Sequence, residues 1–266
     1  MKMHELQKLP PKVLIYSPAG RGKTALMLTL VARCQVLDLD GNLDVGLGLQ
    51  DNLRDERLAV DIKQFPEDQY PKKAVAFARF KKYVYGLTED CAKSKYPFDV
   101  VGLDSLTALS QASQNYVMGN GGRLGENPQI QEWGLLLTEI ENMIVALRSL
   151  PIPVVYLAHE MILTDPDDKT VTYIAIPGQK LPGRVTRMFS EIYYMRVRSR
   201  GGGKHQIYLQ THPSAAVSSR SGRGLPDEYH IATFDKNGPV GDSVSMWEIF
   251  KQIGYEPPPK EEPKLI

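Results

Sequence analysis

The sequence predicts an α/β fold with a mostly parallel sheet flanked by helices and antiparallel strands towards the C-terminal end. Up to residue 159, short apolar segments alternate with longer segments of helical periodicity. Strands that alternate with helices in this way favour a parallel sheet covered on both faces. From about residue 190, Tyr- and Val-rich segments of alternating polarity are joined by tight glycine connections, which is typical of antiparallel strands.

The individual elements follow from local patterns along the chain. The predicted strands are apolar or alternating runs at 12–17, 35–40, 58–65, 98–104, 153–159, 190–199, 205–211 and about 230–234. The predicted helices cover 24–34, 72–93, 105–118, 130–150 and 242–254, the last with Asp242 as its N-cap. We expect one domain at 12–253, an N-terminal arm at 1–11 and a flexible, Pro- and charge-rich tail at 254–266.

The composition is that of an ordinary globular protein with no global attraction to polyanions. Of the 266 residues, 42% are hydrophobic and 24% charged, and the formal net charge is +1. Binding of nucleic acid would therefore need a local basic patch. Cys34 and Cys91 show no metal or disulfide spacing, which favours a reducing compartment. No signal peptide and no apolar run of spanning length is visible, so we expect a cytoplasmic protein without a membrane partner.

A glycine-rich segment, SPAGRGKT at 17–24, follows the first predicted strand. It matches the Walker A pattern G-x-x-x-x-G-K-[ST] except that Ser17 replaces the first glycine. Gly20 and Gly22 would let the backbone N–H groups approach phosphate, Lys23 would reach the β- and γ-phosphates, and Thr24 would hold Mg²⁺. The residues expected to bind the nucleotide are Ser17, Pro18, Ala19, Gly20, Arg21, Gly22, Lys23, Thr24 and Ala25.

Carboxylates follow other predicted strands, where a second magnesium-organising group and a catalytic group are needed. Asp104 ends the apolar run FDVVGLD and is the candidate Walker B residue, the alternative being a cap for the next helix. Asp40 is the candidate for positioning the attacking water, with Asp38 expected on the same strand face and Glu160 as a rival.

Together these segments resemble the RecA-like P-loop NTPase core, and more narrowly the phage-encoded RecA-like ATPases of single-strand annealing. The resemblance covers roughly 12–225 and rests on VLDLDGNLD, VVGLDSLTAL and VVYLAHE. It implies that Asp40 occupies the position of a catalytic glutamate and that Asp44 contacts adenine. It also implies that the Asp104–Ser105 pair is the Walker B end and that His159 senses the γ-phosphate where many relatives have glutamine. Asp40 departs from the family by being one methylene shorter.

The same resemblance implies two DNA-binding loops and an arginine finger. The loops correspond to 119–129 and 161–183, with Arg123, Lys169, Tyr173, Lys180 and Arg184 as candidate contacts to single-stranded DNA. Arg220 and Arg223 match the region that reaches a neighbouring subunit's γ-phosphate. The alternatives are solvated surface side chains in the loops and an ordinary basic hairpin tip.

These expectations define one leading function and two alternatives. The leading one is a Mg²⁺- and ATP-dependent ATPase that binds single-stranded DNA and promotes annealing or recombination. It would act as a ring or filament with ATP at its subunit interfaces, in a host cytoplasm if phage-encoded. A single-strand-binding protein is left open as a further partner. The alternatives are a P-loop enzyme acting on a small molecule, such as a nucleotide kinase, and a nucleotide-dependent scaffold without turnover.

Overall fold

The computed structural model describes residues 9–30, 33–43, 60–164, 170–178, 181–214, 216–235 and 238–255. Their strands form one 11-stranded sheet, whose main path has the order β11-β10-β8-β7-β1-β5-β4-β2-β3. β6 pairs with β5, and β9 pairs with β7, beside this path. The strands are β1 (Lys12–Ser17), β2 (Cys34–Asp38), β3 (Val60–Gln64), β4 (Val100–Asp104), β5 (Val154–Thr164), β6 (Thr170–Ile174), β7 (Glu191–Ser199), β8 (His205–Gln210), β9 (Arg220–Ser221), β10 (Glu228–Asp235) and β11 (Gly238–Pro239).

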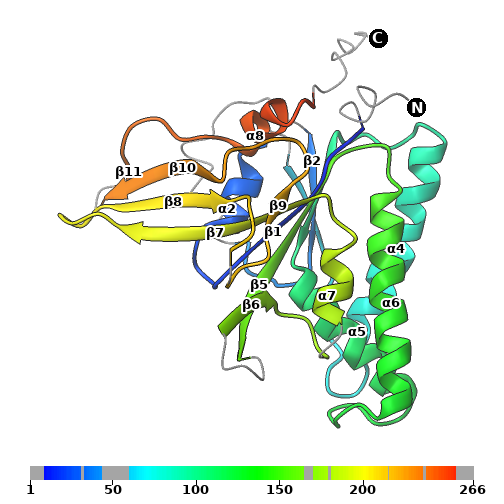
Figure 1. Cartoon of the computed structure of the whole chain (residues 1–266). Coiled ribbons are helices and arrows are strands. Elements are labelled where there is room, and N and C mark those ends of the chain that lie inside the picture. Colours follow the sequence, from blue (N-terminus) through cyan, green and yellow to red (C-terminus); the bar gives the residue numbers. More distant parts are fainter. Residues whose placement is uncertain are drawn as a thin grey trace.

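The sheet has a parallel half and an antiparallel half. β3, β2, β4, β5, β1 and the first part of β7 pair in parallel. β7, β8, β10 and β11 then pair antiparallel and extend beyond the helices, as Figure 1 shows. The predicted mixed sheet, with antiparallel strands towards the C-terminal end, is therefore confirmed.

Helices cover the parallel half on both faces. They are α2 (Lys23–Leu28), α4 (Ala76–Ala92), α5 (Leu106–Asn120), α6 (Ile130–Arg148), α7 (Leu181–Thr186) and α8 (Met246–Gln252). α4, α5 and α6 pack together on one side of the sheet. α2 and α8 contact each other and pack on the opposite side.

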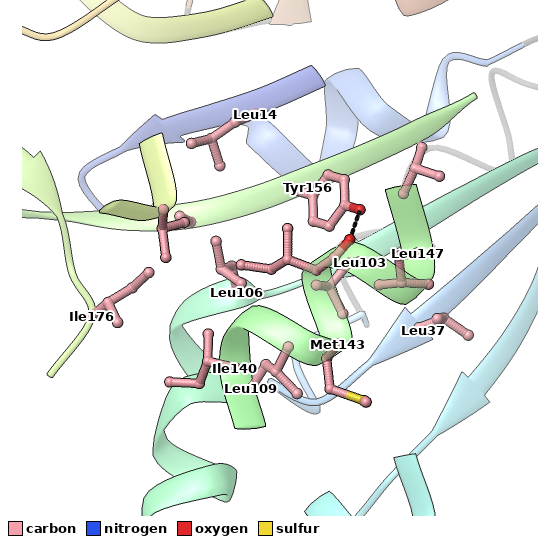
Figure 2. Close-up of a cluster of buried hydrophobic side chains, with 14 of the residues drawn as sticks. Leu14, Leu37, Leu103, Leu106, Leu109, Ile140, Met143, Leu147, Tyr156 and Ile176 are labelled. Atoms are coloured by element: carbon pink, nitrogen blue, oxygen red, sulfur yellow. Dashed lines mark hydrogen bonds between the residues drawn. The ribbon is translucent and has the colours of Figure 1, made fainter. Parts of the chain in front are cut away.

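Alternation along β1 sends side chains into two separate cores. Leu14 and Tyr16 join the cluster under α4, α5 and α6, whereas Val13 and Ile15 join the cluster under α2 and α8. Figure 2 shows the first cluster, in which strand residues such as Leu103 meet the inward faces of α5 and α6. The hydroxyl of Tyr156 also donates to the carbonyl of Ile144 there, at 3.4 Å.

Two predicted elements end earlier than their patterns suggest. The helix predicted at 24–34 ends at Leu28, and Cys34 already belongs to β2. The strand predicted at 35–40 ends at Asp38, because the carboxylate of Asp38 accepts from the N–H of Gly41 and closes a turn. Asp38 and Asp40 therefore do not share a strand face, which corrects that prediction.

The segment predicted as a loop at 161–183 is mostly regular structure. β5 continues to Thr164 and forms an antiparallel hairpin with β6, and α7 begins at Leu181. The reason is that 161–164 is mostly apolar and 170–174 is rich in β-branched residues, both of which suit paired strands.

The C-terminal elements correct two smaller predictions. α8 is capped by Ser245 rather than Asp242, because Ser245 and Glu248 form a reciprocal capping box. Tyr255, which the predicted tail includes, is buried and stacks edge-on against Phe250, so it belongs to the packed domain. The described helices include none long and apolar enough to cross a membrane.

Candidate nucleotide-binding site

The glycine-rich segment forms the connection between β1 and α2. Gly20 and Gly22 have φ angles of 69° and 91°, a region that L side chains rarely adopt. Ser17, in contrast, is the last residue of β1 and pairs in register with His159 of β5. Because Ser17 has the extended conformation of a strand, the position does not need glycine.

Lys23 folds back over this loop. Its Nζ donates to the carbonyl oxygens of Ser17 and Pro18, at 3.1 and 2.9 Å, and to Ser17 Oγ at 3.1 Å. Burial lowers the pKa of Lys23 to about 8, while nearby carboxylates, Asp104 first, oppose the shift. Phosphate oxygens could replace the neutral acceptors of Lys23, and their negative charge would raise its pKa again.

Thr24 and Asp104 meet at the carboxyl ends of β1 and β4. Thr24 Oγ1 donates to Asp104 Oδ2 at 2.7 Å. The alternative in which Asp104 caps α5 is wrong, because Ser105 is the N-cap and accepts from the N–H of Ala108. Burial raises the pKa of Asp104 to about 6, so a cation beside it would favour the ionised form.

The chemistry of this pair fits Mg²⁺. Among the described residues, no group of three or more His, Cys, Asp or Glu side chains could hold a metal ion by itself. Mg²⁺ commonly binds through one or two protein ligands together with phosphate oxygens and water. Thr24 Oγ1 and a carboxylate oxygen of Asp104 are the groups that would hold it here.

Asp40 and His159 are brought together by two different strands. His159 Nε2 lies 3.5 Å from Asp40 Oδ2, and both side chains are partly exposed. The backbone N–H of His159 donates to Thr107 Oγ1 at 2.9 Å, which fixes the end of the buried part of β5. A cavity of about 420 Å³ adjoins Asp40 and Thr107. The predicted catalytic acid and the predicted phosphate sensor thus form one pair.

The two other acidic candidates are already engaged. The carboxylate of Asp38 is buried and accepts from Gly41 N at 2.8 Å and from Gln64 Nε2 at 3.1 Å. Glu160 Oε2 accepts from the hydroxyl of Tyr194 at 2.6 Å. Burial, aided by Glu160, raises the pKa of Tyr194 to about 12, so this phenol stays protonated as a donor.

The three described candidates for DNA contact have partners or strand pairing within the chain. Arg123 donates to Glu126 and Glu132, at 2.8 and 2.7 Å, and Arg184 donates to Glu141 at 2.8 Å. Tyr173 lies in β6 opposite Met161. Three further predicted residues, Asp44, Lys169 and Lys180, lie outside the described residues.

The two candidate finger arginines contact their own chain. Arg220 donates to the carbonyl oxygens of Thr186, at 2.7 Å, and of Phe189. Arg223 donates to the carbonyl oxygen of Leu9 at 2.8 Å. To act in a neighbouring subunit's site, these arginines would have to break their hydrogen bonds to main-chain carbonyls and bind a phosphate instead.

Sequence reasoning missed two polar residues that border the site. Thr107 supports β5 through the N–H of His159, and its position three residues after Asp104 is the only signal for it. Tyr194 donates to Glu160, and it lies in the alternating segment EIYYMRVRS. The alternation predicted a strand there but gave no functional role to its polar side chains.

The fold and this site define a P-loop NTPase: a mostly parallel sheet, a glycine-rich loop after β1, and a Thr–Asp pair at the strand ends. A family model described as an AAA domain matches residues 9–221, which is well over half of the chain. The chain therefore belongs to the AAA-domain family, whose members are nucleotide-binding ATPases of the P-loop type. No curated protein sequence matches the chain.

Proposed function

We propose that this protein is a RecA-like ATPase of the phage single-strand annealing type, which couples ATP to binding of single-stranded DNA. The Asp40–His159 pair carries the proposal, since it lies at the strand ends beside the Thr24–Asp104 pair. These four positions match the catalytic acid, the phosphate sensor, Walker A and Walker B of the RecA-like pattern. The AAA-domain family by itself supports the broader ATPase assignment.

The chain's own groups account for the chemistry of hydrolysis. The loop N–H groups and Lys23 would hold the phosphates of ATP, and Thr24 and Asp104 would hold Mg²⁺, which offsets phosphate charge. Asp40 would accept a hydrogen bond from a water molecule that attacks the γ-phosphorus, as the bond to the bridging oxygen breaks. His159 would donate from Nε2 to a γ-phosphate oxygen, because it lies at the same edge.

We further propose an oligomer, a ring or a filament, with ATP at its interfaces. Arg220 is exposed at the surface beside β7, and its present acceptors are main-chain carbonyls, which are weaker partners for a guanidinium than phosphate. Sedimentation with an ATP analogue and single-stranded DNA should reveal multimers. Only monomers under these conditions would contradict the oligomer.

The experiment that tests the function is ATP hydrolysis with and without single-stranded DNA, for the wild type and Lys23→Ala. We expect DNA to stimulate hydrolysis, and the variant to lose about 100-fold or more because a cation at the phosphates is removed. Hydrolysis that is indifferent to DNA would contradict DNA coupling and favour an enzyme acting on a small molecule.

A nucleotide-dependent scaffold is a second candidate, favoured by one observation. Asp40 is shorter than glutamate, and His159 already lies 3.5 Å from its carboxylate. A water-positioning acid that is out of reach would allow binding without turnover. Binding of a fluorescent ATP analogue without phosphate release would identify this case.

A further inference from the structure

One face of β7 and β8 carries arginines and tyrosines, and within the described residues it adds no side chain beyond Tyr194 to the core under α4–α6. Residues two apart on a strand share a face, and directly paired residues of antiparallel strands share it too. Tyr194, Arg196 and Arg198 therefore share a face of β7, and Arg196 pairs directly with Tyr208 of β8. We call these four residues the arginine–tyrosine face. Of the described residues in β7, β8 and β10, only Ile192 and Tyr194 pack in the core under α4–α6.

Aromatic rings and guanidinium groups alternate on this face. The guanidinium of Arg196 lies 5.5 Å from the ring centre of Tyr194, and that of Arg198 lies 4.9 Å from the ring centre of Tyr208. Such cation–π contacts keep the planar groups spread over the sheet. Arginines two residues apart are spaced by about 6.8 Å along a strand.

The face continues into a cavity beside the phosphate-binding loop. This cavity, of about 430 Å³, is lined by Pro18 and Arg21 of the loop and by Tyr194, Arg196 and Arg198 of β7, among others. Its far wall includes Thr172 of β6 and Val217. A ligand lying on the face would therefore extend to within reach of the loop that binds the nucleotide.

The charges around the cavity favour an anionic ligand. Arg198 is paired with Glu228, but within the described part of the chain neither Arg21 nor Arg196 has an acidic partner. Arg200, directly after β7, donates to the neutral groups of Gln206 and Tyr208. In contrast, the two arginines predicted from the sequence to bind DNA already form ion pairs. Arg123 pairs with Glu126 and Glu132, and Arg184 pairs with Glu141.

We propose that the arginine–tyrosine face and its cavity bind single-stranded nucleic acid, and that the hydrogen bond from Tyr194 to Glu160 couples this strand to the nucleotide site. The proposal rests on the proposed function and gives its DNA a site. A single strand suits this surface because guanidinium groups meet phosphates while unpaired bases stack on rings. An acidic peptide would use the charges but would leave the rings without a partner.

The coupling follows from the chain of contacts at Tyr194. Its ring lines the cavity, and its hydroxyl donates to Glu160 at 2.6 Å. Glu160 directly follows His159, whose Nε2 lies 3.5 Å from Asp40 Oδ2 at the proposed nucleotide site. A bound nucleic-acid strand that moves the Tyr194 ring would therefore shift the part of β5 that carries His159.

Binding is tested on the full chain by anisotropy of a labelled oligothymidylate of about 16 nucleotides, with an ATP analogue present. Arg196→Glu and Tyr208→Ala should each weaken binding about tenfold, through lost phosphate contact and lost stacking. Arg196→Ala should also lower the salt dependence by about 0.7 in log–log slope, which a structural role would not do. The control is Arg79→Glu on α4, an exposed arginine outside the arginine–tyrosine face whose partner is Asp68.

The outcomes separate this inference from the proposed function. A wild type that binds no oligothymidylate would overturn both. A wild type that binds, with Arg196→Glu and Tyr208→Ala binding equally well, would overturn the site and leave the function standing. Polyglutamate or duplex DNA that binds this face as tightly as the oligothymidylate would overturn the choice of a single strand.

Coupling is tested with Tyr194→Phe, which keeps the ring and removes the hydroxyl. In the wild type, the oligothymidylate should change the affinity for the ATP analogue, and the analogue should change oligothymidylate affinity by the same factor. In Tyr194→Phe we expect oligothymidylate to bind within about twofold of its affinity for the wild type. The factor by which each ligand changes the affinity for the other should be close to one in this variant. An unchanged factor in the variant would contradict the role of this hydrogen bond.

Discussion

The parallel and the antiparallel halves of the sheet differ in how they are covered. Strands of the parallel half send alternate side chains into two cores, one under α4–α6 and one under α2 and α8. The strands β8 and β10 supply buried side chains only to the second core among the described residues. One half is therefore packed on both faces, and the other keeps one face open.

This difference separates two kinds of polar group. At the strand ends of the parallel half, polar side chains have partners within the chain, as in the Thr24–Asp104 hydrogen bond. On the open face, the guanidinium of Arg196 lies over the ring of Tyr194, and among the described residues it has no acidic partner. The covered half thus holds its polar side chains in contacts within the chain, whereas the open face carries a guanidinium without an acidic partner among the described residues.

The largest expected contrast is in stability. Leu103→Ala leaves a cavity in the doubly covered half and should lower the free energy of unfolding by about 2–5 kcal/mol. Arg196→Ala on the open face should change it by about 0.5 kcal/mol or less. Urea unfolding of both variants checks this, and similar losses would contradict the proposed difference between the halves.

The next effect concerns Asp104 and pH. Its pKa is raised from 3.8 to about 6, so the folded chain holds this proton more tightly than the unfolded chain. The free energy of unfolding should therefore fall by about 2–3 kcal/mol as the pH rises from about 4 to above 6 in the absence of nucleotide. Asp104→Asn should lack this decrease, and urea unfolding at several pH values measures it. Parallel profiles for the two proteins would contradict the shift.

A third effect concerns the reach of Asp40. Asp40→Glu adds one methylene and should raise turnover about tenfold by bringing the carboxylate closer to the attacking water. Asp40→Asn is the control and should lose turnover. Steady-state kinetics decide this. A lower rate in Asp40→Glu would mean that the site is built for the shorter acid.

The smallest expected effect concerns the N-cap of α8, the helix that shares a core with β8 and β10. Ser245→Ala removes the cap of α8 and should cost about 1 kcal/mol of unfolding free energy. Asp242→Ala is the matched control, because Asp242 does not cap this helix. Thermal unfolding of the two variants measures the difference, and equal losses would argue against the Ser245–Glu248 capping box.

The sequence predicts the sheet class and the phosphate loop well because both depend on local patterns. Walker A spacing and the apolar strand before it identify the loop, and a strand ending in Asp104 identifies its partner. The pairing of Asp40 with His159 is different, since it joins residues far apart in the sequence. Only the order of β2, β4 and β5 in the sheet brings them to one edge.

The errors have equally local causes. The hairpin of β5 and β6 resembles a loop in sequence because polar residues interrupt its short β-branched runs. The cap of α8 was assigned to Asp242, although the spacing of Ser245 and Glu248 is the stronger signal. The open face of β7 could not be predicted at all, because alternation alone does not say which face a helix will cover.

β5 has a mechanical consequence, because one strand belongs to both the main sheet and the hairpin. Residues up to Tyr156 pair with both β1 and β4, and the pairing with β1 continues to His159, whereas the five residues from Glu160 to Thr164 pair with β6. That outer part is about 17 Å long. A tilt of about 10° where it leaves the main sheet, next to His159, would move its far end by about 3 Å. A small rotation at His159 would thus become a larger change of shape at the surface.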